Sequence, residues 1–165
     1  QELNFLTYGL EPVKINGQIV SSTRIRSALI KGNIDDAKKM LGRKFSIEGP
    51  VVKGDGKGRE IGFPTANIDT KDLILPPNGV YVAHTKFNGK THKSLLNIGV
   101  RPTIIKPNPS IQVETHILKF NENIYDQVID IELVDKLRNE IKFESIEELK
   151  KQISCDIKNA KSFYK

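Results

Sequence analysis

The hydrophobic and polar positions along the chain predict short helices near the N-terminus and short strands after them. Two early stretches, one ending before Gly32 and one before Gly42, carry apolar residues at helical spacing. Thr23 is the expected N-cap of the first helix and Asn33 that of the second. The residues expected to face inward are Ile25, Ala28 and Leu29 in the first helix and Ile34, Ala37 and Leu41 in the second. Helices this short are typical of a connector between domains.

Farther along, the pattern becomes that of β-strands. The stretches 80–87 and 93–98 flank Asn88-Gly89, a pair favoured in tight hairpin turns. Apolar and polar residues alternate over 111–118 and again over 129–133. Short strands separated by Gly, Pro and Asn indicate a mainly β protein built on a small closed barrel rather than on a parallel sheet.

The last part of the chain predicts one longer helix. Ser145 and Glu148 have the spacing of a capping box at its start. An apolar stripe follows at helical spacing and should pack on the barrel. Its members are Ile146, Leu149, Ile153, Ile157 and Ala160.

Composition narrows the class of protein only a little. The chain has 165 residues, of which 38% are hydrophobic and 28% charged, and no apolar run approaches the roughly 18 residues of a membrane span. The single cysteine, Cys155, excludes an internal disulfide and is expected to be an inert thiol in a reducing cytoplasm. No secretory signal and no initiator Met are present, so we expect a cytoplasmic protein, without a membrane partner, that is processed or excised from a longer chain. The net charge of +6 suits an anionic ligand but does not require one.

The stretch "GDGKGREIGFPTANI", residues 54–68, is the first candidate for chemistry. It matches neither a dinucleotide-binding turn, because Arg59 stands where the third glycine belongs, nor a phosphate loop of the Walker type. If the following residues are extended, Thr65 and Asn67 point to the same side. Their oxygens could then hold Mg²⁺ and a polyphosphate, or they could simply satisfy local backbone at the entry to a strand.

Glu114 is the second candidate, because it lies on the polar side of an alternating strand. A carboxylate at a barrel mouth could act as a general base toward an alcohol, whereas the alternative is an ordinary solvent-facing glutamate. The three histidines, His84, His92 and His116, lack the spacing of zinc ligands. Arg101 could bind a phosphate or could simply end a strand. Arg138 could belong to the site or could lie in a solvated linker.

Together these segments resemble one family. "VVKGDGKGREIGFPTANI", "LPPNGVYVA", "NIGVRPT", "VETHILKF" and "LRNEIKFESIEELKKQISCD" occur in the order found in the riboflavin kinase domain of bacterial bifunctional riboflavin kinase/FAD synthetases. The resemblance runs from about Phe45 to the end of the chain. Upstream, "IVSSTRIRSALIKGNIDDAKKMLGR" is similar to the closing segment of the adenylyltransferase domain of the same proteins.

The resemblance implies a fold, a reaction and roles for residues. The fold would be a six-stranded antiparallel barrel with a C-terminal helix, and the reaction would convert ATP and riboflavin into ADP and FMN. Glu114 would be the catalytic base, with Mg²⁺ bound by Thr65 and Asn67. The residues implied in ATP binding are Gly54, Gly56, Gly58, Arg59, Gly62, Pro64, Thr65 and Asn67. Those implied in loops near the substrates are Asn97, Arg101, Thr103 and Arg138. Those implied as the nucleotide-phosphate signature of the adenylyltransferase remnant are Ser21, Ser22, Thr23 and Arg26.

The resemblance also implies a division of the chain. Residues 1–26 would be the adenylyltransferase remnant, 27–44 a helical connector and 45–165 the kinase domain. The rest of the adenylyltransferase domain, with its His-x-Gly-His type motif, would be missing, so this chain should not make FAD. Asp126 departs from the glycine usual in the family and should be strained if its φ is positive.

Two other functions stay open from the residues alone. A basic β-barrel could bind nucleic acid, but the chain has no Trp and only seven Phe and four Tyr for stacking on bases. We therefore expect small-molecule substrates and no nucleic-acid partner. A flavin-binding domain that has lost catalysis would keep the same fold.

Overall fold

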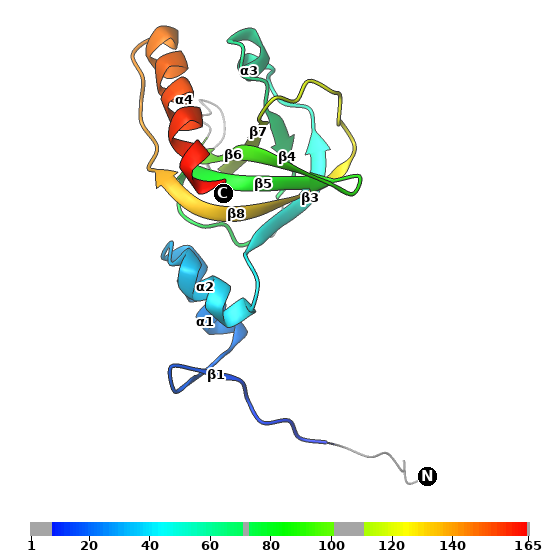
Figure 1. The fold of residues 1–165 in the computed structure, drawn as a ribbon, viewed down its shortest axis with the longest axis vertical. Coiled ribbons are helices and arrows are strands. Elements are labelled where there is room, and N and C mark those ends of the chain that lie inside the picture. The colour runs from blue at the N-terminus through cyan, green and yellow to red at the C-terminus, as the bar shows by residue number, and fades with distance from the viewer. Residues whose placement is uncertain (1–7, 71–72, 101–110, 165) are drawn as a thin grey trace, which may run out of the picture.

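The structure is a computed structural model that describes residues 8–70, 73–100 and 111–164. Its centre is a closed barrel of six antiparallel strands in the order β3-β4-β7-β6-β5-β8 (Figure 1). The strands are β3 (Ser46–Val52), β4 (Ala66–Ile68), β5 (Gly79–Phe87), β6 (Lys90–Val100), β7 (Ile111–Ile117) and β8 (Val128–Arg138). The predicted six-stranded barrel with a C-terminal helix is confirmed.

The alternation in the sequence becomes the inside and outside of the barrel. Val113 and Ile117 of β7 and Ile129 and Ile131 of β8 are buried in one central cluster, while alternate residues, such as Glu114 and His116 of β7, face outward. The predicted hairpin between β5 and β6 turns through Asn88 and Gly89, whose φ angles of 47° and 70° are those of the tight turn expected for this pair.

Three buried hydroxyls lie among the apolar side chains of the barrel. The alternating pattern in the sequence did not distinguish these positions from their apolar neighbours. The Thr85 Oγ1 atom donates to Ser94 Oγ at 2.8 Å and lies 3.2 Å from Thr115 Oγ1. All three side chains are fully buried. Because each hydroxyl has a partner, their burial does not leave an uncompensated polar group.

The helix α4 (Ile146–Ala160) packs on the outside of the barrel, followed by the short 3₁₀ helix η1 (Lys161–Phe163). Ala160 and Tyr164 are buried with Val80, Val82 and Leu95 on the outer side of β5 and β6. Figure 1 shows that the C-terminal end of α4 meets the strands, while its N-terminal end projects beyond them. Ile146, in the first turn, is therefore 56% exposed, and its predicted place in the buried stripe is wrong.

The N-terminal part forms the small hairpin β1 (Lys14–Ile15) and β2 (Gln18–Ile19), then α1 (Ser22–Ile30) and α2 (Ile34–Leu41). The N-cap of α1 is Ser21, not Thr23 as predicted: Ser21 is extended and its hydroxyl accepts from the backbone of Arg24 at 3.3 Å. Ala28, Leu29 and Ala37 join the two helices in a cluster of their own.

The junction between helices and barrel is continuous. Ile34 belongs to the central cluster of the barrel, and α1 runs without interruption through the boundary predicted between residues 26 and 27. The division of the chain into domains therefore stays a prediction. None of the described helices is long and apolar enough to cross a membrane.

The start of α4 offers a test of how much the helix contributes to stability. The Ser145 hydroxyl accepts a hydrogen bond from the backbone N–H of Glu148 at 3.2 Å. The Glu148 carboxylate in turn accepts one from the backbone N–H of Glu144 at 3.2 Å. We expect Ser145→Ala to lower the free energy of unfolding by about 1 kcal/mol, because the first turn loses its cap. The measurement is denaturant unfolding followed by circular dichroism.

Ser154→Ala is the matched control, because Ser154 lies exposed inside the same helix and bonds only to the carbonyl of Lys150. Its effect should stay within about 0.5 kcal/mol. Equal losses of unfolding free energy in the two variants would show that the capping hydroxyl stabilises the helix no more than an ordinary hydroxyl inside it.

Candidate active site

Three predicted site residues form one row on the outer wall of the barrel. Glu114 of β7 is paired with Asn67 of β4 on one side and with Asn97 of β6 on the other. Directly opposed residues in antiparallel strands have Cβ atoms about 4.5–5.5 Å apart and point to the same face. Val113 and Thr115, the neighbours of Glu114, point into the barrel, so the row faces outward. The expectation that Glu114 lies in a barrel mouth is wrong.

The glycine loop (residues 54–62) crosses directly over the side-chain amide of Asn67 in this row. At Gly54, any added methyl group would collide with the side chain of Asn67. At Gly58, it would stand 3.0 Å from the hydroxyl of Thr65 and 2.6 Å from the carbonyl of Phe63. Side chains at either position would push the loop away from Thr65 and Asn67. The loop therefore needs bare backbone at these two points because of what lies beneath it.

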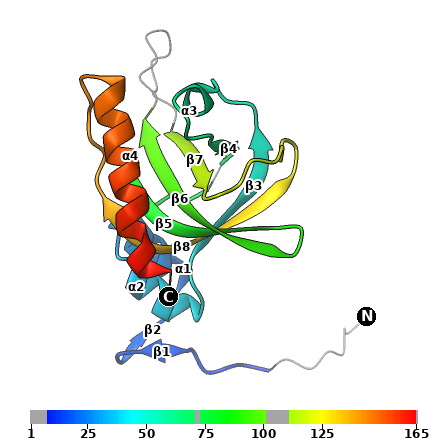
Figure 2. The same cartoon turned by 45° about the horizontal axis from the view of Figure 1, so that its top comes forward.

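The loop also contains a helical turn that the sequence did not predict. This turn is α3 (Lys57–Glu60), which begins after Gly56 with a φ of 75° and is followed by Gly62 with a φ of 90°. These are left-handed conformations that a side chain disfavours. Figure 2 shows α3 and α4 on either side of the ends of β6 and β7.

His116 fixes the segment that enters β4. It lies two residues after Glu114 on the same side of β7, and its Nδ1 atom donates to the carbonyl of Pro64 at 2.8 Å. The ring of Phe63 meets the His116 ring edge-on at 5.9 Å. From the sequence, His116 was considered only as a metal ligand and was excluded as one. Its position two residues after Glu114 in the same strand could have indicated that it lies beside the site.

A cavity of about 650 Å³ opens beside the glycine loop. Arg59, Pro64 and Thr65 line it on the loop side, and Phe120 and Tyr125 line it from the turn between β7 and β8. This volume lies within the range of natural small-molecule sites. Thr65 thus borders the cavity, while Asn67, two residues on, is paired with Glu114 across the strands.

The turn that closes this cavity contains the residue that departs from the family pattern. Asp126 has a φ of 63°, and its backbone N–H donates to the carbonyl of Val51 at 3.0 Å. The condition named for strain at this position, a positive φ, is therefore met. The bond to β3 holds the turn in place although an aspartate there is less favourable than a glycine.

The described residues were also tested for a cation site. No group of three or more His, Cys, Asp or Glu side chains among them could hold a metal ion. Thr65 and Asn67 offer a hydroxyl and an amide oxygen instead, and both lie against the backbone of the glycine loop. Oxygen donors of this kind, few in number and supplemented by phosphate, fit the needs of Mg²⁺.

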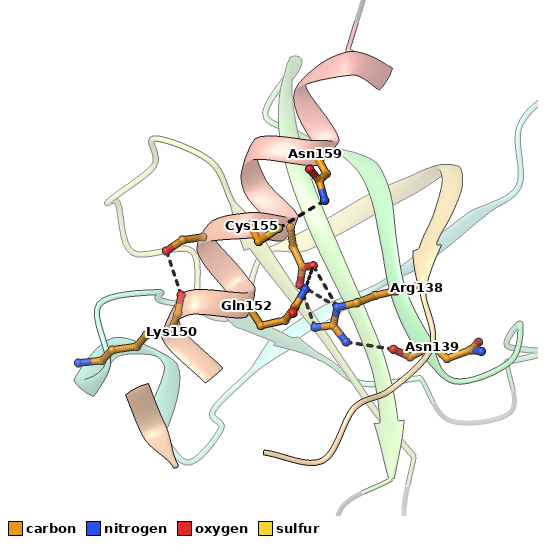
Figure 3. A network of polar contacts seen from close by, with 8 residues as sticks. Arg138, Asn139, Lys150, Gln152, Cys155 and Asn159 are labelled. Carbon is orange, nitrogen blue, oxygen red and sulfur yellow. Dashed lines mark hydrogen bonds and ion pairs between the residues drawn. The ribbon is translucent and has the colours of Figure 1, made fainter. Parts of the chain in front are cut away.

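Arg138 holds α4 to the barrel (Figure 3). Asp156 is only 2% exposed, and both its carboxylate oxygens accept bonds from Arg138 at 2.8–3.0 Å. Gln152 donates to the same carboxylate at 2.8 Å, and Arg138 also donates to the carbonyl of Asn139 at 3.0 Å. This guanidinium is therefore directed at α4, and its implied place near the substrates stays a prediction.

Several groups with shifted pKa values lie on β5, on β8 and at the end of the chain. Burial, together with nearby Lys44, lowers the pKa of His84, which pairs with Glu132 across the strands. Burial also raises the pKa of Tyr81 and of Tyr164 to about 12. In this part of the molecule, shifted pKa values reflect packing rather than catalysis.

The remaining predicted residues are not brought to the row. Ser21, Ser22, Thr23 and Arg26 lie at the start of α1, at the end of the molecule away from α3 (Figure 1). Arg101 and Thr103 lie outside the described residues. The structure thus brings Asn67, Glu114 and Asn97 into one row, places Asn67 against the glycine loop and separates the proposed remnant from them.

Comparison with known proteins identifies the family of the chain. The family model for riboflavin kinase matches residues 41–164. The chain belongs to the riboflavin kinase family. It is 41% identical over 152 residues to the bifunctional riboflavin kinase/FMN adenylyltransferase of Haemophilus influenzae, covering 91% of this chain and 48% of that protein. The namesake from Bacillus subtilis is 38% identical over 147 residues, covering 88% and 46%. This family member therefore spans about half the length of these relatives.

Two solved structures share the fold of this riboflavin kinase family member. A Streptococcus pneumoniae protein described as a macrolide-efflux protein has a TM-score of 0.81 and 32% identity, with 91% of this chain and 49% of that chain covered. The riboflavin kinase from Trypanosoma brucei has a TM-score of 0.51 at 20% identity, with 71% and 77% covered, which supports the fold alone.

The pairing of Arg138 with Asp156 predicts a large loss of stability when it is broken. Asp156→Ala would leave the partly buried guanidinium of Arg138 without its carboxylate, so the free energy of unfolding should fall by about 3 kcal/mol or more. Lys39→Ala is the control, because Lys39 pairs with Asp36 at 3.4 Å on the exposed surface. Its effect should stay below about 1 kcal/mol. Similar values for the two variants in urea unfolding would contradict the structural role of the buried pair.

Proposed function

We propose that this chain transfers the γ-phosphoryl group of ATP to the 5′-hydroxyl of riboflavin, producing FMN and ADP. The observation that carries the proposal is the row of Asn67, Glu114 and Asn97 beneath a glycine loop, in a chain of the riboflavin kinase family. Phosphoryl transfer requires mainly that two substrates be held in line and that charge be neutralised. We assign the nucleotide to the glycine loop and the alcohol to the row.

The nucleotide belongs at the glycine loop. Its bare backbone exposes N–H groups of the kind that bind phosphate oxygens. The cavity of about 650 Å³ beside Arg59 and Thr65 has room for the nucleoside part of ATP. Two residues of extended chain, from Thr65 to Asn67, span about 7 Å and lead from this cavity to Glu114. A triphosphate that follows the same direction would bring its last group to the carboxylate.

Mg²⁺ is the cation whose needs these residues meet. The hydroxyl of Thr65 and the amide oxygen of Asn67 would hold it together with phosphate oxygens, and it would supply neutralisation of the charge on the transferred group. The net charge of +6 further favours a strongly anionic substrate.

The alcohol belongs at the row. Glu114 would accept the proton of the 5′-hydroxyl while that oxygen bonds to the γ-phosphorus and ADP leaves. The amides of Asn67 and Asn97 flank Glu114 on both sides and limit the directions in which its carboxylate can turn. His116, through Pro64, keeps the entry to β4 in register with this arrangement.

The activity of the longer relatives is a separate matter. Their names include FMN adenylyltransferase, and we assign no such reaction to residues 45–165 of this chain. Residues 1–26 are proposed to be the end of an adenylyltransferase domain. The enzyme is proposed to act on small molecules in the cytoplasm, without a nucleic-acid partner.

The direct experiment incubates the protein with riboflavin, ATP and Mg²⁺ and separates FMN by chromatography. FMN formation that depends on all three components is the expected result. Flavin binding without any FMN would identify a domain that has lost catalysis. Salt-sensitive binding of single-stranded nucleic acid, with no affinity for flavin, would replace the proposal by the nucleic-acid alternative.

Glu114→Gln separates the base from the rest of the row. It keeps the shape of the side chain but removes proton acceptance, so kcat should fall by about 10²–10⁴-fold while the KM values for ATP and riboflavin change little. The exposed Glu48 of β3 provides the matched control, because Glu48→Gln removes one negative charge from the outer wall elsewhere. A near-normal kcat for Glu114→Gln would show that this carboxylate is not the base.

Thr65→Ala should give a different kinetic signature. It removes a proposed Mg²⁺ oxygen, so the KM for ATP should rise together with a loss of kcat, and excess Mg²⁺ should recover part of the activity. The exposed Thr91 of β6 serves as control, since Thr91→Ala removes a hydroxyl far from the glycine loop. Loss of activity that is independent of Mg²⁺ concentration would argue against Thr65 as a ligand.

A further inference from the structure

A second carboxylate reaches the outer face that carries Glu114. Glu140 lies between β8 and α4, and its Oε1 atom sits directly above the α-carbon of Gly99 on β6. A methyl group added at Gly99 would collide with this oxygen and would stand 3.4 Å from Nδ2 of Asn97. Glu140 and Asn97 therefore share one small space on the barrel wall. A side chain at position 99 would expel Glu140 from it.

Separate parts of the chain hold Glu140 in this place. Asn78, just before β5, donates from Nδ2 to Glu140 Oε2 at 2.9 Å. The segment that carries Glu140 begins at Arg138, which is bound to Asp156, and ends at the capped Ser145. Both ends of this short segment are thus fixed to rigid elements. Glu140 is an exposed residue, yet its position is determined.

The register of the strands sets the distance between the two carboxylates. Asn97 is paired with Glu114, and Gly99 is paired with Gln112, so the position beneath Glu140 is diagonal to Glu114. Diagonal neighbours in antiparallel strands are about 7–8 Å apart. A flexible chain of a few carbon atoms can reach from one carboxylate to the other.

The chemistry of the pair points to the alcohol substrate. Two carboxylates would repel the phosphates of ATP, whereas each can accept a hydrogen bond from a hydroxyl group. The segment between β8 and α4, which carries Glu140, runs on the α4 side of β6 and β7, and α3 lies on the other side (Figure 2). The polyol chain of riboflavin presents several hydroxyls near the one that is phosphorylated.

We propose that Glu140 binds the polyol chain of the flavin by accepting a hydrogen bond from a hydroxyl other than the 5′-hydroxyl, with Asn97 beside it. This rests on the proposed function. Glu140 thereby selects a flavin that carries a polyol over one that does not, and it orients the terminal hydroxyl toward Glu114. Asn78 and the pair of Arg138 with Asp156 act as positioning residues for it.

The test compares two flavins in the whole protein by fluorescence titration. Riboflavin carries the polyol chain, and lumiflavin has a methyl group in its place. We expect Glu140→Gln to weaken riboflavin binding by about ten-fold or more, because a hydrogen bond to a charged acceptor is lost, and to leave lumiflavin binding unchanged. The KM for ATP should also be unchanged. Glu144→Gln, in the same segment and also exposed, should alter none of these values.

Each of the other possible outcomes would overturn a specific part of the proposal. Equal losses for riboflavin and lumiflavin would show that Glu140 only supports the fold, and a melting temperature lowered in parallel would agree with that. Unchanged riboflavin affinity in Glu140→Gln would remove Glu140 from the site while leaving the kinase proposal intact. Failure of the unmodified protein to bind riboflavin at all would overturn the proposed function and this inference with it.

Discussion

The structure depends above all on the register of β4, β7 and β6. Because side chains alternate along a strand, a slip of one residue in β7 would turn Glu114 into the barrel and bring Val113 or Thr115 to the outer wall. The buried cluster of apolar residues prevents this slip, since every inward position of β7 from Val113 to Ile117 is filled. The same packing that closes the barrel thus sets Asn67, Glu114 and Asn97 in one row. Stability and the geometry of the site have a common origin.

Much of this could be predicted from the sequence because it is local or periodic. The alternation over 111–118, the turn at Asn88-Gly89 and the cap at Ser145 each indicated its own element, and the structure has all three. The candidate residues Asn67 and Glu114 were also found, because their residue types and neighbouring motifs resemble a known family. Where local signals competed, they were less decisive: Ser21 rather than Thr23 caps α1, since both residues can cap a helix and only the backbone conformation distinguishes them.

The rest depends on contacts between distant parts of the chain, which no short pattern contains. The sequence showed four glycines in the loop, but not that Gly54 lies over Asn67 and Gly58 over Thr65. It placed Arg138 near the substrates without revealing its buried partner eighteen positions later. The sequence did not single out Gly99. Its actual role, to leave room for a carboxylate more than forty residues away, follows only from the folded barrel.

Under the proposed function, these long-range contacts would let one small barrel treat its two substrates differently. The glycine loop and the cavity beside Arg59 offer N–H groups, oxygens and a positive charge, whereas the wall near α4 offers carboxylates and amides. In the proposed reaction, the phosphates of ATP would bind at the first region, while a neutral polyol could bond to the second without opposing charge. The phosphate of the product would lie beside Glu114, where like charge disfavours it. The separation of charge that orients the proposed substrates would therefore also favour release of the product.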